Sequence, residues 1–256
     1  MYLEELELRD FRNYDQVTLE FSPQINILIG QNAQGKTNLL EAIYVLAMAR
    51  SHRTNNEREL IRFKAKGAFL AGRIKRKLGT IPLEIALSRQ GKKAKVNHLE
   101  QARLSQYIGN LNVILFAPED LALVKGAPAV RRRFIDMEFG QIDPKYLYDL
   151  AQYKAILKQR NNYLKQLQQK KAQDTLYLEV LSEQLATFGA AVISKRLTFL
   201  AELESYAQEI HSAITQGNEK LAFHYESNLK DILDPDESKT ITELKRGYAN
   251  IQSKEI

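Results

Sequence analysis

The chain has 256 residues, of which 44% are hydrophobic and 27% charged, a composition typical of a globular protein with one large or two ordinary domains. It has no cysteine, which excludes disulfide frameworks and cysteine-ligated metal sites, and its net charge of +6 favours polyanionic partners. The acidic start at residues 2–5 does not fit a signal peptide, and no run is expected to reach the roughly 18 apolar residues of a membrane span. We therefore expect a cytoplasmic protein without a membrane partner.

The first segment, residues 2–21, is expected to form a β-hairpin. Val17, Leu19 and Phe21 alternate with polar residues, as in a strand with one buried face. Residues 25–29 are then a short apolar, β-branched run, which predicts a buried strand.

Residues 30–37 fit the phosphate-binding loop pattern G-x-x-x-x-G-K-[ST] at every fixed position. They are Gly30, Gln31, Asn32, Ala33, Gln34, Gly35, Lys36 and Thr37. Apolar residues at helical spacing follow, so the loop is expected to aim backbone N–H groups and a helix dipole at phosphate oxygens. In such a loop Lys36 reaches the β- and γ-phosphates, and Thr37 holds Mg²⁺ through its hydroxyl. A chance match is expected in roughly one chain in a hundred, so the sequence predicts a nucleotide site.

Residues 50–66 are predicted to be irregular, and residues 67–97 to form an antiparallel sheet with turns near residues 78–80 and 90–92. This sheet carries many lysines and arginines. A solvated outer face is the default explanation, and a nucleic-acid surface is the alternative.

Residues 113–116 predict another buried strand, and a helix is expected to begin at Pro128, with Arg131, Arg132 and Arg133 in its first turns. Cations there oppose the helix dipole, which favours an anionic partner. A hydrolytic site also needs an acid at a strand end. Glu119 and Asp120 are separated from the apolar run at residues 113–116 by Ala117 and Pro118, and the acids at residues 136 and 234 follow apolar runs of only two residues. None of these acids therefore fits the position that a hydrolytic site needs.

From about Pro144 apolar residues recur at heptad-like spacing, which predicts a helical hairpin with its turn near residues 168–175. An intermolecular coiled coil is the alternative. Between Ala151 and Gln173 there are six lysines or arginines and no acid. A strand near residues 221–225 and a final polar helix are expected to follow.

Three sequence blocks resemble the RecF family of bacterial recombination-repair ATPases, which are related to SMC proteins and ABC ATPases. The blocks are residues 9–14 with 36–44, residues 116–136, and residues 157–161. The resemblance implies an α/β fold: a P-loop NTPase head of the SMC/ABC type with a mixed β-sheet, plus an α-helical lobe with a long antiparallel hairpin. It implies an ATP-binding lobe over residues 1–125 and a mainly helical lobe over residues 126–256, with its arm at about 144–215.

The resemblance also implies ATP and Mg²⁺ as cofactors, and an ATP-dependent homodimer of the intact family member on DNA. It implies binding to single-stranded and gapped duplex DNA, and cooperation with RecO and RecR in recombinase loading and SOS induction. Arg12 and Asn13 would lie near the base and ribose of the nucleotide. Glu119 would lie in a loop that contacts metal or water.

The sequence departs from the family pattern in one respect. The family's signature motif and its Walker B acids lie in the final third of the full-length chain, and this sequence stops at Ile256 before both. We therefore expect an N-terminal fragment of a P-loop ATPase that binds ATP without turnover. A P-loop kinase acting on a small molecule is the alternative function, and a structural coiled-coil protein is a third.

Overall fold

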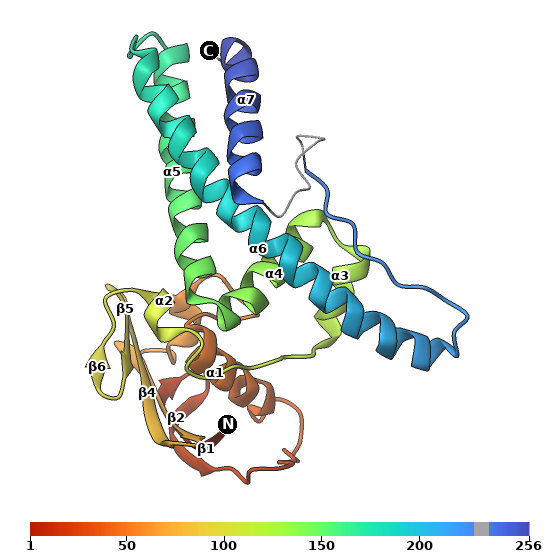
Figure 1. The fold of residues 1–256 in the computed structure, drawn as a ribbon. Helices are drawn as coiled ribbons and strands as arrows, with labels where there is room; N and C mark the ends of the chain where they lie inside the picture. The colour runs from red at the N-terminus through yellow and green to blue at the C-terminus, as the bar shows by residue number, and fades with distance from the viewer. Residues whose placement is uncertain (228–235, 256) are drawn as a thin grey trace. The chain divides into compact units, whose positions relative to one another are not determined.

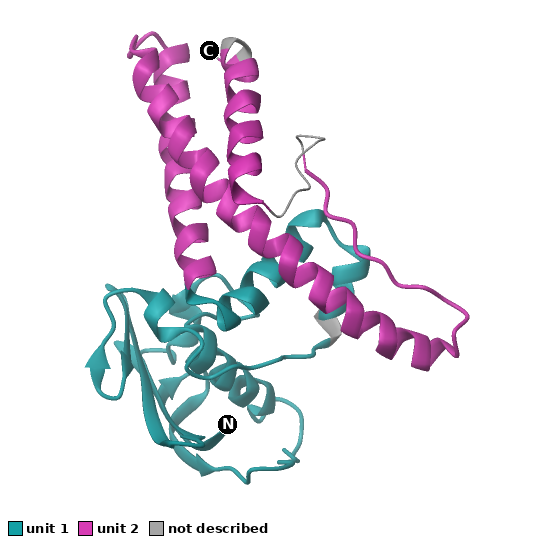
Figure 2. Ribbon diagram, viewed as in Figure 1, with its two compact units in different colours: residues 1–144 teal, residues 145–256 magenta. Residues whose placement is uncertain are grey.

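The computed structural model describes residues 1–227 and 236–255, except for the side chains of residues 118, 119, 253 and 254. The chain forms two compact units, Met1–Pro144 and Lys145–Ile256, coloured teal and magenta in Figure 2.

The first unit is built on a six-stranded sheet in which every pairing is antiparallel (Figure 1). Its strands are β1 (Tyr2–Phe11), β2 (Tyr14–Glu20), β3 (Gly67–Arg76), β4 (Gly79–Ser88), β5 (Gly91–Val96) and β6 (Leu99–Glu100). They lie in the order β2-β1-β3-β4-β5-β6. The expected hairpin at residues 2–21 and the antiparallel sheet at residues 67–97 are both confirmed.

One face of this sheet is covered by helix α1 (Lys36–Met48). Leu6 and Leu8 of β1 point into the core with no exposed surface, while Glu5 and Glu7 alternate with them on the other face. Gly72 on β3 permits the close approach of α1, because a Cβ atom there would lie 2.5 Å from Leu46 Cδ2. The apolar residues that follow the phosphate-binding loop thus fix α1 against the sheet.

The rest of the first unit consists of short helices and loops. They are the 3₁₀ helices η1 (Glu57–Leu60) and η2 (Pro118–Leu121), and the α-helices α2 (Leu104–Tyr107), α3 (Ala122–Lys125) and α4 (Pro128–Ile142). Tyr107 is fully buried and donates its hydroxyl to the Leu46 carbonyl at 2.5 Å. Burial also raises the pKa of Tyr107, so this hydroxyl stays a donor. The helix expected at Pro128 is confirmed.

The second unit contains α5 (Pro144–Gln168), α6 (Thr175–Thr215) and α7 (Glu237–Glu255) (Figure 1). Near the turn, Leu164 and Leu167 of α5 pack on Leu178 of α6; further away, Ile156 packs on Leu181 and Leu185. These contacts confirm the expected antiparallel hairpin, with its turn between residues 168 and 175. They also account for the heptad-like pattern within one chain.

A buried arginine connects α7 to the hairpin. Arg160 is 3% exposed; it donates Nε to Ser182 Oγ at 2.9 Å and its two Nη atoms to the Glu255 carboxylate at 3.1 and 2.5 Å. Its guanidinium also lies 5.2 Å from the ring centre of Tyr248. This arginine, in one of the family-like blocks, therefore has a structural role.

Three predicted strands are absent from the structure. Residues 25–29, 113–116 and 221–225 are not in strands, and Ile25, Ile29 and Ile114 are 83%, 90% and 91% exposed. The mixed sheet was therefore a wrong prediction for the described residues, whose sheet is antiparallel. The physical reason is strand pairing. An apolar run becomes a strand only where a neighbouring strand bonds its backbone N–H and C=O groups, and no strand among the described residues pairs with any of these three runs. The acid at residue 234 lies outside the described residues.

Helix α6 corrects the expectation that no segment is long and apolar enough for a membrane span. By length and composition alone this helix is long and apolar enough to cross a membrane. Half of its most apolar window is buried. In the second unit, Leu181 and Leu185 of α6 pack with Ile156 of α5, and Ala186 and Ala190 pack with Leu244 of α7. Packing between helices thus explains this apolar character, and length by itself is weak evidence for a membrane span.

Candidate nucleotide-binding site

The phosphate-binding loop ends in a glycine that no other residue can replace without strain. Gly35 is the residue before α1, has φ of 105° and is buried. A Cβ atom there would lie 2.9 Å from both Asn13 Nδ2 and Tyr14 Oη. Positive φ and close approach together therefore require glycine at this position.

The start of α1 is arranged to receive an anion. No side chain caps this helix end, and its first turn contains no acid. The first helical bond runs from Leu39 N to Gly35 O at 2.9 Å, so the N–H groups of the preceding residues have no acceptor within the helix. Their partial positive charge and the exposed loop fit a phosphate group.

Lys36 lies across the loop that precedes it. Its Nζ donates to the carbonyls of Gly30 and Gln31 at 2.7 and 2.6 Å. These bonds close residues 30–36 into a ring of backbone with the ammonium group at its edge. A phosphate held by the N–H groups of this ring would meet the lysine charge directly.

The turn between β1 and β2 holds the loop from the other side. Tyr14 donates its hydroxyl to Gly35 O at 3.2 Å, and Asn13 Nδ2 lies 3.5 Å from Gln34 O. Asn13 also accepts from Asn38 Nδ2 at 2.8 Å. The hairpin at the start of the chain thus positions both the loop and the first turn of α1.

A buried carboxylate connects this turn to α1. Glu41 has no exposed surface and accepts two bonds from Arg12, from Nε at 2.9 Å and Nη2 at 2.7 Å. It also accepts from Ser51 Oγ at 2.5 Å and from Arg53 Nη1 at 3.2 Å. Arg53 Nη1 donates to Asn38 Oδ1 as well, at 2.9 Å. We call Arg12, Glu41, Ser51 and Arg53 the Glu41 cluster.

The electrostatics of the Glu41 cluster favour the ionised carboxylate. Burial by itself would raise the pKa of Glu41, but the hydrogen bonds from Arg12 and Ser51 and the charges of Arg12 and Arg53 outweigh it. The pKa of Glu41 is therefore lowered. An ionised carboxylate holds both arginines beside the loop.

Of the two predicted site residues outside the loop, only Asn13 contacts the loop, whereas Arg12 bonds Glu41. Residues 30–37 form the loop, and Asn13 is in contact with it. The Arg12 guanidinium bonds the Glu41 carboxylate and also donates Nη1 to Glu59 O at 2.9 Å. Sequence reasoning did not identify Glu41, Ser51 or Arg53 as members; the available signal was an acid within the apolar run of α1.

The metal-binding predictions concern Thr37 and Glu119. Thr37 is exposed at the start of α1. The side chain of Glu119 lies outside the described residues, and the neighbouring Asp120 accepts from Ala117 N at 2.7 Å in a local turn. Among the residues the structure describes, no group of three or more acids or histidines could hold a metal. Any Mg²⁺ at Thr37 would therefore depend on phosphate oxygens and water for its other ligands.

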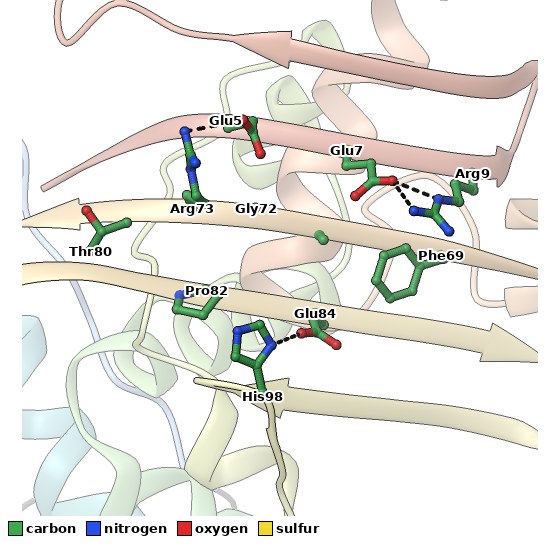
Figure 3. Close-up of a pocket in the computed structure, with 11 residues that line it drawn as sticks. Glu5, Glu7, Arg9, Phe69, Gly72, Arg73, Thr80, Pro82, Glu84 and His98 are labelled. Carbon is green, nitrogen blue, oxygen red and sulfur yellow. Dashed lines mark hydrogen bonds and ion pairs between the residues drawn. The ribbon is translucent and has the colours of Figure 1, made fainter.

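The solvent face of the sheet is hollowed but its charges pair with one another (Figure 3). Arg73 bonds Glu5 at 3.3 Å, and Glu7 bonds Arg9 at 2.6 Å. Glu84 contacts His98 at 2.6 Å, and Lys95 at 3.6 Å. Acids therefore neutralise much of this face, which makes it a poor surface for a polyanion.

Comparison with known proteins gives one consistent family. The model of the RecF/RecN/SMC N terminal domain matches residues 2–108. The DNA replication and repair protein RecF of Ligilactobacillus salivarius is 63% identical over 260 residues, covering 100% of this chain and 68% of that protein. The RecF protein of Bacillus subtilis is 52% identical over 257 residues, covering 100% of this chain and 69% of that protein.

Solved structures agree with the sequence relatives. A structure of the recombination mediator protein RecF-ATP in the RecFOR pathway has a TM-score of 0.92 and 31% identity, over 98% of this chain and 67% of that chain. Its ATPrS counterpart has a TM-score of 0.90 at the same identity. The chain therefore belongs to the RecF family of DNA replication and repair proteins.

Proposed function

We propose that this chain binds ATP at residues 30–37 and acts on DNA with RecO and RecR, as its family membership implies. The activity would be to bind single-stranded and gapped duplex DNA and to support recombinase loading and SOS induction in the cytoplasm. The observation that carries the proposal is the closed phosphate-binding loop, in which Lys36 Nζ contacts Gly30 O and Gln31 O. A RecF-ATP complex with 31% identity supports ATP as the nucleotide.

Within this proposal the predicted residues have distinct roles. The loop N–H groups and Lys36 would hold the phosphates, and Thr37 would contribute its hydroxyl to Mg²⁺, which would offset phosphate charge. Asn13 would contact the nucleotide from the hairpin turn. Arg12 would act mainly by holding that turn on Glu41, because three of its guanidinium hydrogen bonds are already made within the protein.

In this proposal the two predicted lobes have separate roles. Residues 1–125 would form the ATP-binding lobe, and residues 126–256 the mainly helical lobe. An ATP-dependent homodimer would bring two such chains together on DNA. We expect this chain to bind ATP without turning it over, because the acids at residues 119, 120, 136 and 234 do not directly follow an apolar strand in the sequence.

The test is nucleotide binding by Lys36→Ala, with Lys75→Ala as a control that removes one exposed lysine from the sheet. Titration with a fluorescent ATP analogue should show a loss of at least about tenfold for Lys36→Ala, since a charge-assisted bond to phosphate contributes about 1.5–3 kcal/mol. Equal affinities in the two variants would refute the site. Steady phosphate release by the unaltered chain would refute the expected lack of turnover.

A further inference from the structure

The side of α5 that faces solvent carries lysines with exposed side chains. The helix buries Ile156, Leu164 and Leu167 against its neighbours, and its opposite side exposes Lys158 and Lys165. Two more exposed lysines, Lys170 and Lys171, follow in the turn to α6. We call Lys158, Lys165, Lys170 and Lys171 the arm lysines.

The stretch of chain around the arm lysines, from Ala151 to Gln173, contains no acid. Asp149 and Asp174 are the nearest acids in the sequence on either side. Asp149 accepts from Lys145 Nζ at 2.7 Å, and Asp174 caps α6 by accepting from Leu176 N at 2.8 Å. No ion pair involves an arm lysine within residues 1–227 and 236–255, so their charges are available to an external anion.

The lysines of β5 differ in this respect. Lys93 bonds Glu100 at 3.1 Å, Lys95 lies 3.6 Å from Glu84, and Lys92 contacts Glu57. A polyanion that bound there would compete with these carboxylates. The three lysines of β5 thus face carboxylates, whereas none of the arm lysines does so among the residues that the structure describes.

The spacing of the arm lysines suits an extended anion. Lys158 and Lys165 are seven residues apart, so they lie about two turns, or about 10 Å, apart along one side of the helix. Exposed Asn161 and Asn162 lie between them, and amide groups are also frequent donors to phosphate. A row of such donors fits a regularly charged backbone better than a single small anion.

We propose that the arm lysines bind the phosphate backbone of DNA along the exposed side of α5 and the turn that follows it. This inference rests on the proposed DNA-binding function and identifies the surface that would perform it. Contacts of this kind hold the backbone and read no base, so they are independent of sequence and strongly dependent on salt.

The experiment compares two fourfold variants of the full chain that lose the same charge. The first changes the arm lysines to glutamine: Lys158→Gln, Lys165→Gln, Lys170→Gln and Lys171→Gln. The second changes four sheet lysines: Lys75→Gln, Lys77→Gln, Lys93→Gln and Lys95→Gln. Binding of a fluorescent gapped duplex is measured by anisotropy from 50 to 300 mM salt, and circular dichroism verifies helix content in both.

Each phosphate contact contributes about 0.9 to the slope of log affinity against log salt, so the arm variant should lose about 3 to 4 from that slope. Its affinity at the lowest salt should fall by at least about tenfold, and the sheet variant should change by less than about twofold. Replacing the arm lysines with arginine should retain binding, because the charge is kept.

Two results would overturn the inference in different ways. If the sheet variant loses as much slope as the arm variant, or more, DNA binding stands but the surface is wrong. If the unaltered chain does not bind DNA at 50 mM salt, the proposed function fails together with the inference.

Discussion

Replacing Glu41 should destabilise the first unit more than any exposed acid does. The carboxylate is fully buried and accepts from Arg12, Ser51 and Arg53 at 2.5–3.2 Å. Breaking a buried ion pair by removing one partner costs about 3–5 kcal/mol. Arg12 keeps 18% of its side-chain surface exposed and can recover some hydration, so we expect about 3 kcal/mol for Glu41→Ala.

A loss of this size is measurable by urea or thermal unfolding followed by circular dichroism. About 3 kcal/mol corresponds to a fall in Tm of roughly 6–12 °C for a chain of this size. Glu20→Ala is the matched control, because Glu20 is exposed at the end of β2. Glu41→Gln should fall between the two, since the amide keeps the shape and one acceptor oxygen.

A double-mutant cycle tests the reasoning behind that magnitude. If Arg12 and Glu41 stabilise the protein as a pair, the loss in the double alanine variant should be smaller than the sum of the single losses by about 1 kcal/mol or more. Additive losses would refute the coupling. A Glu41→Ala variant as stable as Glu20→Ala would refute the importance of the Glu41 cluster.

Three further predictions concern pH, the loop and the arm. Because the folded pKa of Glu41 is lowered, its contribution to stability should be fully present above its unfolded pKa of about 4.3 and be lost as pH falls through the lower folded value; acid titration of unfolding in the wild type and Glu41→Gln measures the difference. Gly35→Ala should lower ATP affinity by at least about tenfold with a smaller loss of stability, because its Cβ would push Asn13 and Tyr14 away from the loop; ATP titration beside thermal unfolding separates the effects. Arg160→Ala should leave the Glu255 carboxylate without its arginine partner, so amide exchange in α7 should become faster in the variant than in the wild type, and the increase should be larger in α7 than in α5. Equal protection of α7 in the variant and the wild type would contradict the role of Arg160 in holding α7.

Local patterns in the sequence were enough to predict most helices and hairpins. The period of α1, the heptad-like seam of α5 and α6, and the alternation in β1 to β5 are each contained in one stretch of chain. The phosphate-binding loop is equally local, because its eight positions specify its turn and its lysine. These elements needed no knowledge of distant contacts.

Other features depend on partners far away in the sequence. Residues 25–29 have the composition of a buried strand, yet Ile27 is 76% exposed. Whether such a run forms a strand depends on a second segment that bonds its backbone, and the composition of the run does not reveal that segment. The Glu41 cluster joins Arg12 to a residue 29 positions later. A buried acid in an apolar helix face was the visible signal, but the sequence did not identify which cations would meet it.

The arrangement of contacts also bears on how strongly this chain binds ATP. The loop is held on its C-terminal side by Asn13, Tyr14 and α1, whereas the preceding residues 25–29 are exposed and outside the sheet. Fixing the backbone of one residue costs about 1–2 kcal/mol, so a nucleotide that has to order even two or three of these residues loses several kcal/mol of binding free energy. Weak ATP binding by the unaltered chain would therefore agree with a correctly assigned loop. The difference between Lys36→Ala and its lysine control measures two losses together: the lysine contact with phosphate, and the bonds from Lys36 Nζ to Gly30 O and Gln31 O that help to order the loop.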